Sequence, residues 1–168
     1  VYARNIAEEG NSVIAYLVKN DQQGFDMYIS AEGGVKAPSD IRALFAQYNS
    51  DTSTLGTGWN ANITKIDFAG NFDTSETTTM DALFYGCTNL TTVLGIEQLS
   101  TQNVTNISRL FTNCSSIDNV DLSAWNTSNV KNISRLFQGC TSLSNVRLNW
   151  DETNTRNFTD ISYAFYQC

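Results

Sequence analysis

One eleven-residue sequence pattern occurs four times in this chain. The copies are TTTMDALFYGC (77–87), VTNISRLFTNC (104–114), VKNISRLFQGC (130–140) and FTDISYAFYQC (158–168). When the copies are aligned on their Phe residues, successive copies are 27, 26 and 28 residues apart. Periods of this length are typical of solenoids, in which each repeat packs only against its neighbours in the chain. The sequence therefore predicts a stacked array, which offers an extended surface and not an enclosed pocket.

The first half of each repeat has the spacing of a short helix. In the second copy Val104, Ile107, Phe111 and Cys114 recur at i, i+3, i+7 and i+10, which places them on one helical stripe. Oxygen-bearing residues such as Asn103 precede the stripe, where a helix needs an N-cap. Gly or Asn stands just before Cys in three of the copies, as at a helix end. We therefore predict a helix of about two turns in each copy.

Each of the first three copies is followed by a segment with the LxxLxL spacing of a short strand. Ile117, Val120 and Leu122 show it after the second copy, and the polar residues Asn119 and Asp121 alternate with the last two. One face of this strand is therefore buried and the other faces water. Parallel strands lie about 4.8 Å apart, whereas helices need about 8 to 10 Å. This mismatch should bend the array with its strands on the concave side.

The predicted fold is an α/β solenoid, a stack of short parallel strands and short helices. Residues 1–37 are predicted to form an N-terminal β cap, because NSVIAYLV and GFDMYIS have the pattern of a β-hairpin that covers the first strand of the stack. Residues 38–168 form the repeat solenoid. Its first repeat, 38–62, is degenerate but keeps Ile41 and Phe45 in register.

Composition and charge exclude several classes of function. A chain of 168 residues with 41% hydrophobic residues can bury one continuous core. The formal net charge of −7 repels phosphates and anionic lipids, so we expect neither a nucleic-acid partner nor electrostatic membrane attachment. No apolar run approaches the length that spans a membrane. The absence of His removes the commonest general base and transition-metal ligand, which argues against an enzyme.

One cysteine ends each of the four copies. They are Cys87, Cys114, Cys140 and Cys168. Zinc sites use pairs of ligands two to four residues apart, which this spacing lacks, and no calcium-binding loop is present, so we predict neither a metal nor a cofactor. Stacking brings neighbouring repeats close enough for disulfides. A small thiol fills the same niche without a bond, and we favour a reduced, buried ladder over disulfides.

Two aromatic columns follow from the same alignment. The first is a core ladder of Phe84, Phe111, Phe137 and Phe165. In the second, Trp125 and Trp150 are equivalent to Phe72 and Leu99. A glycan or peptide could stack on such a row, but a second core ladder is favoured because Leu99 serves equally well there. Trp59, in a polar loop, is the better candidate for an exposed aromatic contact.

The candidate partner-binding residues lie on the polar face of the strands. They are Lys65, Asp67, Asn119, Asp121, Asn145 and Arg147, together with Trp59 in the loop. Their charges alternate without a convergent cluster, which suits a broad protein-binding surface more than a substrate site. Catalysis would need a perturbed carboxylate pair. The close acidic pairs of the strand regions are Asp118 with Asp121 and Asp151 with Glu152.

Two further sets of polar residues have alternative interpretations. Arg109 and Arg135 occupy matching positions, where Ala82 and Tyr163 stand in other copies. They form either a small basic strip for an acidic partner or ordinary solvated charges. Several Asn-x-Ser/Thr triplets resemble glycosylation acceptors. Most fall at repeat-equivalent positions, so we interpret them as side chains that satisfy the backbone; they begin at Asn62, Asn89, Asn103, Asn106, Asn113, Asn126, Asn132 and Asn157.

The repeats resemble those of a known family. The run ITKIDFAGNFDTSETTTMDALFYGCTNLTTV, followed by LSTQNVTNISRLF and AWNTSNVKNISRLF, is similar to the repeats of about 26 residues in BspA-like leucine-rich-repeat surface proteins, which are also known from mycoplasmal lipoproteins. The resemblance covers residues 62–168 and departs from the pattern at Thr77, Phe158 and Gln167. It implies that the solenoid is a right-handed, leucine-rich-repeat-like stack. It also implies a bacterial, secreted or wall-anchored protein whose relatives bind host matrix proteins and other cells, and it brings no catalytic residues.

The leading hypothesis is a non-catalytic adhesion or recognition module, secreted or on a bacterial cell surface. It would bind host or neighbouring-cell proteins, including matrix proteins, through its repeat surface. The alternative is a structural stalk or spacer that presents another domain. The chain stops directly after the fourth copy, without a polar cap, and we interpret it as a fragment of a longer protein, which keeps the spacer hypothesis open.

Overall fold

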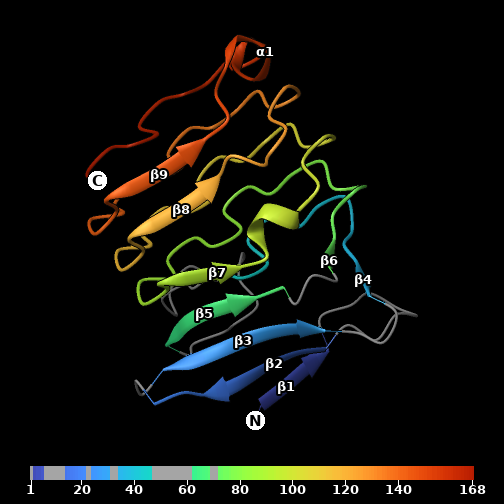
Figure 1. Ribbon diagram of the computed structural model, residues 1–168, viewed down its shortest axis with the longest axis vertical. Helices are drawn as coiled ribbons and strands as arrows, with labels where there is room; N and C mark the ends of the chain where they lie inside the picture. Colours follow the sequence, from blue (N-terminus) through green and yellow to red (C-terminus); the bar gives the residue numbers. More distant parts are fainter. Residues whose placement is uncertain (1, 6–13, 22–23, 31–33, 47–61, 69–71) are drawn as a thin grey trace.

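The computed structural model describes residues 2–5, 14–21, 24–30, 34–46, 62–68 and 72–168. The strands lie one above another along the long axis, from β1 at one end to β9 and the short helix α1 at the other (Figure 1). The strands are β1 (Tyr2–Asn5), β2 (Ile14–Lys19), β3 (Phe25–Ser30), β4 (Val35–Lys36), β5 (Ile63–Asp67), β6 (Phe72–Asp73), β7 (Thr92–Leu94), β8 (Asn119–Leu122) and β9 (Asn145–Leu148). The helices are the 3₁₀ turn η1 (Ile96–Gln98) and α1 (Glu152–Thr155).

The repeat strands pair in parallel, as the repeat pattern predicts, except that β7 and β8 lie in different sheets and do not pair. Strand β5 pairs with β7, and β8 pairs with β9, with Val120 opposite Val146 and Leu122 opposite Leu148. Short strands β4 and β6 form a second parallel pair. In β8 the exposed and buried residues alternate strictly, so one face of the strand packs on the core and the other meets water.

The predicted N-terminal hairpin is present and covers the first repeat strand. Strands β2 and β3 are antiparallel, β1 adds a third antiparallel strand, and β3 pairs in parallel with β5. Gly24 lies where the hairpin meets β5, and a Cβ there would be 2.5 Å from Cγ2 of Thr64. Strand β4 lies in the predicted cap and β6 lies in the predicted solenoid, so their pairing also joins these two parts across the predicted boundary at residue 37. The division into a cap and a solenoid stays a prediction.

The turn segments contain no helix, and the predicted two-turn helices are wrong. Among the described residues the only helices are η1 and α1, and each lies between a strand and the next turn segment. In the middle of segment 104–114, Arg109 has φ 56°, which is the left-handed conformation. The equivalent residues Ala82, Arg135 and Tyr163 have φ 57°, 58° and 56°. A left-handed residue interrupts an α-helix, so the α/β assignment has to be corrected to a solenoid of strands and turns.

Backbone hydrogen bonds in the turn segments run alternately between repeats and within them. The N–H of Phe111 donates to the carbonyl of Leu136 in the next repeat at 2.9 Å, whereas the N–H of Thr112 donates back to Arg109 at 3.1 Å. The N–H of Phe137 donates to the following repeat in the same way. The side opposite the strands is therefore a second backbone ladder, which holds each turn directly against the next.

The structure removes the physical reason for the predicted bend of the array. The bend was predicted from the wider spacing of helices relative to strands. The turn side is instead a backbone hydrogen-bond ladder, like the strand pairs β5–β7 and β8–β9, so both sides require a similar separation between repeats where the strands pair. A concave strand side no longer follows from the spacing argument.

Residues expected to cap helices connect neighbouring repeats instead. The hydroxyl of Thr101 donates to the carbonyl of Asn126 at 3.0 Å, and the amide of Asn103 donates to the carbonyl of Ser75 at 2.7 Å. Thr127 donates to the following repeat in the same way. These side chains are donors between turns and not acceptors for the first N–H groups of a helix.

The residue before each Cys is left-handed, as predicted from Gly86, Asn113 and Gly139. Their φ angles are 73°, 62° and 73°, and Gln167 adopts the same conformation with φ 59°. A Cβ on Gly139 would come within 2.5 Å of Oδ1 of Asn113 in the preceding repeat. This position therefore favours a residue that is small or that enters the left-handed region easily.

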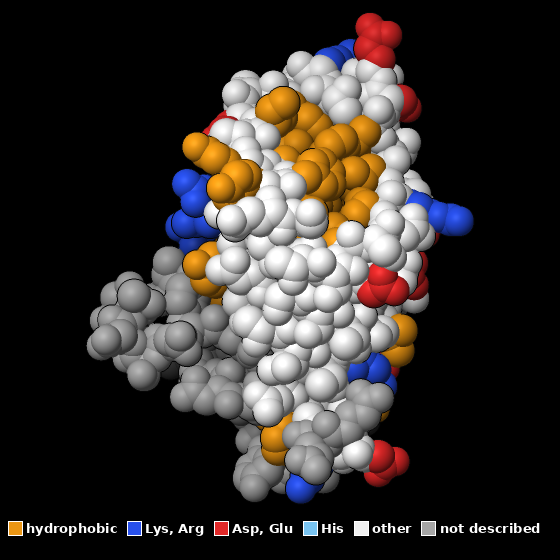
Figure 2. Space-filling view, turned by 90° about the vertical axis from the view of Figure 1, so that its left-hand side faces the viewer, with side chains coloured by type: hydrophobic (Ala, Val, Ile, Leu, Met, Phe, Trp, Pro, Cys, Tyr) orange, Lys and Arg blue, Asp and Glu red, His pale blue; other side chains and the backbone are white. Residues whose placement is uncertain are grey.

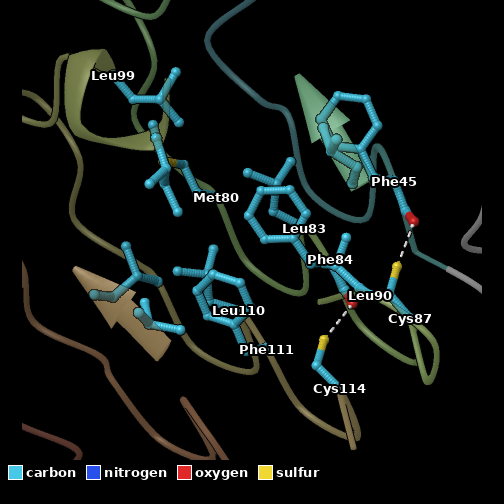
Figure 3. Packing of buried hydrophobic residues seen from close by; sticks show 14 of the residues in the cluster. Phe45, Met80, Leu83, Phe84, Cys87, Leu90, Leu99, Leu110, Phe111 and Cys114 are labelled. Carbon is cyan, nitrogen blue, oxygen red and sulfur yellow. Dashed lines mark hydrogen bonds between the residues drawn. The ribbon is translucent and has the colours of Figure 1, made fainter. Parts of the chain in front are cut away.

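The phenylalanine column is the centre of the core (Figure 3). The rings of Phe84 and Phe111 stack with centroids 5.0 Å apart, those of Phe111 and Phe137 at 5.5 Å, and those of Phe137 and Phe165 at 5.4 Å. Phe45 stacks on Phe84 at 5.8 Å, which gives the degenerate first repeat its place in the column. Phe165, on the last turn, is 44% exposed.

The second aromatic column is also core. Phe72, Leu99 and Trp125 are buried, and the indole N–H of Trp125 donates to the carbonyl of Ile96 at 2.8 Å. Trp150 is half-buried and packs edge-on against Phe158. The interpretation of this column as a glycan or peptide platform is therefore not supported, whereas the core interpretation is confirmed.

The four cysteine thiols are reduced and form a hydrogen-bonded ladder. Each Sγ donates to the carbonyl of the phenylalanine in the preceding repeat at 3.0 to 3.1 Å, for example from Cys114 to Phe84. Cys87, Cys114 and Cys140 are buried. Burial raises the pKa of the Cys140 thiol to about 12 and, with the neighbouring thiols, raises that of Cys114 well above the ordinary value. The predicted reduced, buried ladder is confirmed for Cys87, Cys114 and Cys140, whereas Cys168 is exposed.

Candidate interaction surfaces

The predicted strand-face residues are divided between two sheets. Lys65 and Asp67 lie on β5 in the five-stranded sheet, whereas the other strand-face candidates lie on β8 and β9. Trp59 lies outside the described residues. The structure thus does not bring these side chains together at one point, and their role in binding stays a prediction.

Lys65 is held by partners within its own sheet. Its Nζ lies 3.3 Å from Oδ2 of Asp26, 3.0 Å from the hydroxyl of Tyr28 and 4.7 Å from the centre of that ring. The hydrogen bond to Tyr28 and the charge of Asp26 raise the pKa of Lys65. Lys65 therefore stabilises the junction between the N-terminal hairpin and the first repeat strand, and a partner would have to displace these contacts.

The β8–β9 face is more accessible. Arg147 and Asp121 are cross-strand neighbours whose charged atoms are 3.9 Å apart, and both side chains are more than half exposed. The hydroxyl and N–H of Ser123 lower the pKa of Asp121 more than Arg147 does. Asn119 and Asn145 stand opposite each other two register positions away, on the same face, and are exposed. Such a weakly paired, exposed ion pair contributes little to stability and can exchange partners.

The acidic pairs that could have served catalysis have structural partners. The carboxylate of Asp118 accepts from Asn119 at 2.7 Å and from the hydroxyl of Ser144. Asp151 caps α1 by accepting the N–H of Asn154 at 2.8 Å. Within the described ranges there is no group of three or more metal-ligating side chains, and no helix is long and apolar enough to cross a membrane.

Several Asn-x-Ser/Thr triplets take part in backbone hydrogen bonding, as interpreted from their positions. Oδ1 of Asn106 accepts the N–H of Ser108 at 2.9 Å, and Asn132 accepts the N–H of Ser134 at 2.8 Å. Asn103 and Asn157 instead donate to carbonyls of the preceding repeat. Since these amide groups are engaged, the triplets at these positions are explained by the fold.

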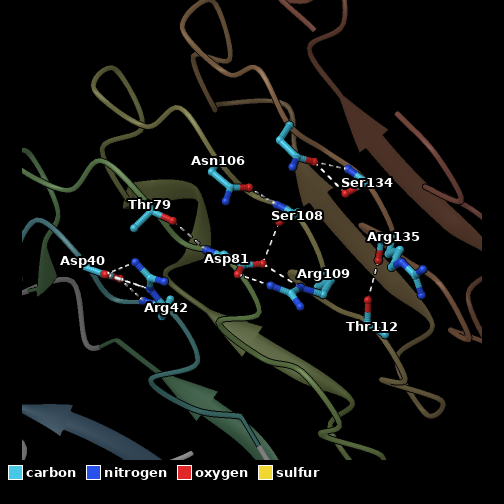
Figure 4. Close-up of polar contacts among 11 residues, drawn as sticks. Asp40, Arg42, Thr79, Asp81, Asn106, Ser108, Arg109, Thr112, Ser134 and Arg135 are labelled. Carbon is cyan, nitrogen blue, oxygen red and sulfur yellow. Dashed lines mark hydrogen bonds and ion pairs between the residues drawn. The ribbon is translucent and has the colours of Figure 1, made fainter. Parts of the chain in front are cut away.

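A polar cluster lies on the turn face and is built on two successive turns (Figure 4). The carboxylate of Asp81 accepts two hydrogen bonds from Arg109, at 2.5 and 3.0 Å, and one from the hydroxyl of Ser108 at 2.7 Å. Asp81 is buried and Arg109 is partly exposed. The two-pronged geometry is the strong form of an Arg–carboxylate pair.

The next turn repeats the arginine without the acid. Arg135 occupies the same left-handed position as Arg109, but the position equivalent to Asp81 is Ser108. The guanidinium of Arg135 lies over the ring of Tyr163 at 5.3 Å and donates to the side chain of Gln138 at 3.3 Å. Among the described residues no carboxylate lies within ion-pair distance of Arg135.

Sequence reasoning identified the two arginines and missed Asp81. The alignment of the copies held the signal, because Asp81 stands where the later copies have Ser108, Ser134 and Ser162. The left-handed conformation of the arginines had no such signal, since Arg has no preference for that region.

Comparison with known proteins identifies the family. A family described as "Mycoplasma protein of unknown function, DUF285" matches residues 40–168. The chain belongs to this family. No curated protein matches the sequence. The finer resemblance to BspA-like proteins stays a prediction.

Two solved structures are similar over much of the chain. One is a leucine-rich cell surface protein from Faecalibacterium prausnitzii A2-165, with 14% identity, a TM-score of 0.33, and coverage of 99% of this chain and 46% of that protein. The other is a leucine-rich-repeat protein from T. pallidum, with 16% identity, a TM-score of 0.32, and coverage of 89% and 79%. This chain thus spans less than half the length of the first. The architecture described here rests on the chain's own hydrogen bonds and packing.

Proposed function

We propose that this DUF285 repeat chain is a non-catalytic recognition module of a bacterial cell surface, which binds host or neighbouring-cell proteins through its repeat surface. The supporting observation is the ladder of the turn side, where backbone hydrogen bonds join each turn to the next and form an extended and regular surface. Repeat arrays use such surfaces to bind macromolecules through many modest contacts.

The β8–β9 face is the best-placed part of the predicted binding surface. Asn119, Asp121, Asn145 and Arg147 are exposed there on neighbouring strands. By contrast, Lys65 is partly buried between Asp26 and Tyr28. A partner protein can compete for Arg147 without breaking a buried contact, because its pairing with Asp121 is long and exposed.

A binding assay tests this proposal. The purified chain is applied to immobilised extracellular-matrix proteins, and captured protein is measured by surface plasmon resonance. We expect saturable binding to at least one of them, and a loss of about ten-fold in affinity for an Asn145→Lys, Arg147→Glu double variant, because both changes alter one patch. Lys131→Glu, a charge change on an exposed residue of the turn face, is the matched control and should leave this binding unchanged.

The alternative function is a spacer that presents another domain. It is favoured by one observation, that most polar side chains between turns are already used in inter-repeat hydrogen bonds such as those of Thr101 and Asn103. A spacer predicts no saturable binding to any matrix or cell-surface protein. Binding that depends on Arg147 would reject it.

A further inference from the structure

The chain contains its own example of how a turn-face arginine binds a carboxylate. Arg109 holds Asp81 of the preceding turn with two hydrogen bonds, and Ser108 adds a third to the same carboxylate. Arg109 is left-handed, with φ 56°, and its side chain is partly exposed on the turn face. Arg135 has the same backbone conformation on the next turn, with φ 58°.

Arg135 has no carboxylate partner among the described residues, whereas Arg109 on the adjacent turn pairs with Asp81. The backbone N–H of Arg109 donates to Ser134 and that of Arg135 donates to Ser162, so the two arginines stand on adjacent turns. Arg135 uses one guanidinium nitrogen in the bond to Gln138, and no carboxylate among the described residues pairs with it. The pKa of Asp160, on the following turn, is lowered chiefly by the N–H and hydroxyl of Ser162 and least by Arg135.

The surroundings of Arg135 combine positive charge with exposed aromatic rings. Tyr163 lies under the guanidinium and is 56% exposed, and Tyr166, which contacts Tyr163 edge-on, is 50% exposed. Figure 2 shows Lys and Arg side chains grouped beside exposed hydrophobic side chains on one flank of the molecule. The chain as a whole has a net charge of −7, so this positively charged patch is a local exception. A guanidinium beside exposed tyrosine rings favours a ligand with an anionic group that can also pack on a ring.

We propose that Arg135, together with Tyr163 and Tyr166, binds a carboxylate from an acidic segment of a partner protein. The inference rests on the proposed function as a recognition module and names a second face for it. The internal Asp81–Arg109 pair shows the geometry, in which a carboxylate receives both prongs of the guanidinium. The Tyr163 ring holds the guanidinium in place, so less side-chain freedom is lost when the carboxylate binds.

An NMR titration tests the inference. The probe is the capped peptide Gly-Glu-Gly-Glu-Gly, added to isotope-labelled protein, with Gly-Gln-Gly-Gln-Gly as the uncharged comparison. We expect the Nε–H signal of Arg135 and the ring signals of Tyr163 to shift and saturate with the acidic peptide alone. The Nε–H signal of Arg109 should move less, because Asp81 already occupies that guanidinium.

Matched variants decide between a specific site and general attraction. Arg135→Gln should weaken binding of the acidic peptide by about five-fold or more, whereas Arg147→Gln on the strand face should change it by less than about two-fold. Both side chains are exposed, so both variants keep the fold. Equal losses for the two variants, or saturable binding of a sulfated polysaccharide and not of the peptide, would overturn the inference.

Failure of this inference is distinguishable from failure of the proposed function. If a matrix protein binds through the β8–β9 face while the acidic peptide does not shift Arg135, only the second face is rejected. If the peptide binds at Arg135 and no matrix protein is captured, the acidic-segment site stands and its partner lies outside the matrix proteins.

Discussion

At the scale of single residues, the left-handed position in each turn segment is the most unusual feature. Ala43, Ala82, Arg109, Arg135 and Tyr163 all adopt it, with φ between 54° and 58°. This conformation costs an L-residue about 1 to 2 kcal/mol. The cost is offset because the N–H of each of the first four donates to the next turn, so the surrounding ladder fixes the conformation.

The phenylalanine column predicts a large stability difference between its middle and its end. Phe111 is fully buried between two stacked rings, so Phe111→Ala should lower the free energy of unfolding by about 3 to 5 kcal/mol through lost burial and the cavity that remains. Phe165 is 44% exposed and stacks on one side, so Phe165→Ala should cost about 1 to 2 kcal/mol. Urea denaturation measures both, and equal costs would contradict the ladder.

The thiol ladder predicts a loss of stability in alkaline solution. Burial keeps the Cys140 thiol protonated up to a pKa of about 12 in the folded chain, whereas a thiol in the unfolded chain ionises near 9.0. Between these values the unfolded state binds fewer protons, so the free energy of unfolding falls as pH rises. We expect a decrease of about 1 kcal/mol per pH unit for each buried thiol, measured by denaturation at pH 8 and pH 10.5.

A serine variant provides the control for this pH dependence. In a Cys114→Ser, Cys140→Ser variant the hydroxyls can donate to the same phenylalanine carbonyls, which lie 3.1 and 3.0 Å from the thiols. Serine does not ionise in this range, so the variant should lose less stability between the two pH values. Identical slopes for the parent and the variant would show that other groups cause the decrease.

At the scale of elements, the turn segment explains why the helix prediction failed. Apolar residues three and four apart, such as Ile107, Leu110, Phe111 and Cys114, are buried. Two consecutive tight turns bury such residues just as a helix does, so the spacing alone cannot separate the two structures. The strands were predictable, because the alternation of polar and apolar residues in Asn119–Leu122 is typical of a strand with one buried face.

The alternating hydrogen bonds predict a pattern of amide exchange. The N–H groups of Phe84, Phe111 and Phe137 donate to the next turn and should exchange slowly, close to the rate set by global unfolding. The equivalent N–H of Phe165, on the last turn, donates to no acceptor in the described part of the chain and should exchange faster by a factor of about a hundred or more. Hydrogen exchange measured by NMR checks this, and uniform protection would contradict the ladder.

At the scale of the whole molecule, the two ends of the stack differ. The N-terminal hairpin lies beside β5, so the first repeat strand is not an open edge. At the other end Ile161, Phe165 and Tyr166 are exposed, and Figure 2 shows hydrophobic side chains gathered in the half of the molecule that holds the last turns. The stack is thus covered at one end and carries an exposed apolar surface at the other.

Removal of β1 and β2 should move the edge of the sheet from β1 to β3 and uncover part of the core. Deletion of residues 1–19 removes β1 and β2, which leaves β3 without its antiparallel partner and removes the buried side chain of Leu17. Open strand edges pair with other chains, so we expect the shortened protein to form oligomers in size-exclusion chromatography with light scattering. Deletion of residues 1–5 moves the edge only from β1 to β2 and should leave the oligomeric state unchanged.

The amino-acid sequence was sufficient to predict the repeat, the parallel strands, the hairpin, and the two core columns with their reduced thiols. Each follows from periodic apolar positions, which report burial directly. The path of the turn segments and the pairing of Asp81 with Arg109 emerged only in three dimensions. Arg109 has no local preference for a left-handed backbone, and contacts with the next turn, 25 residues further along the chain, hold it there.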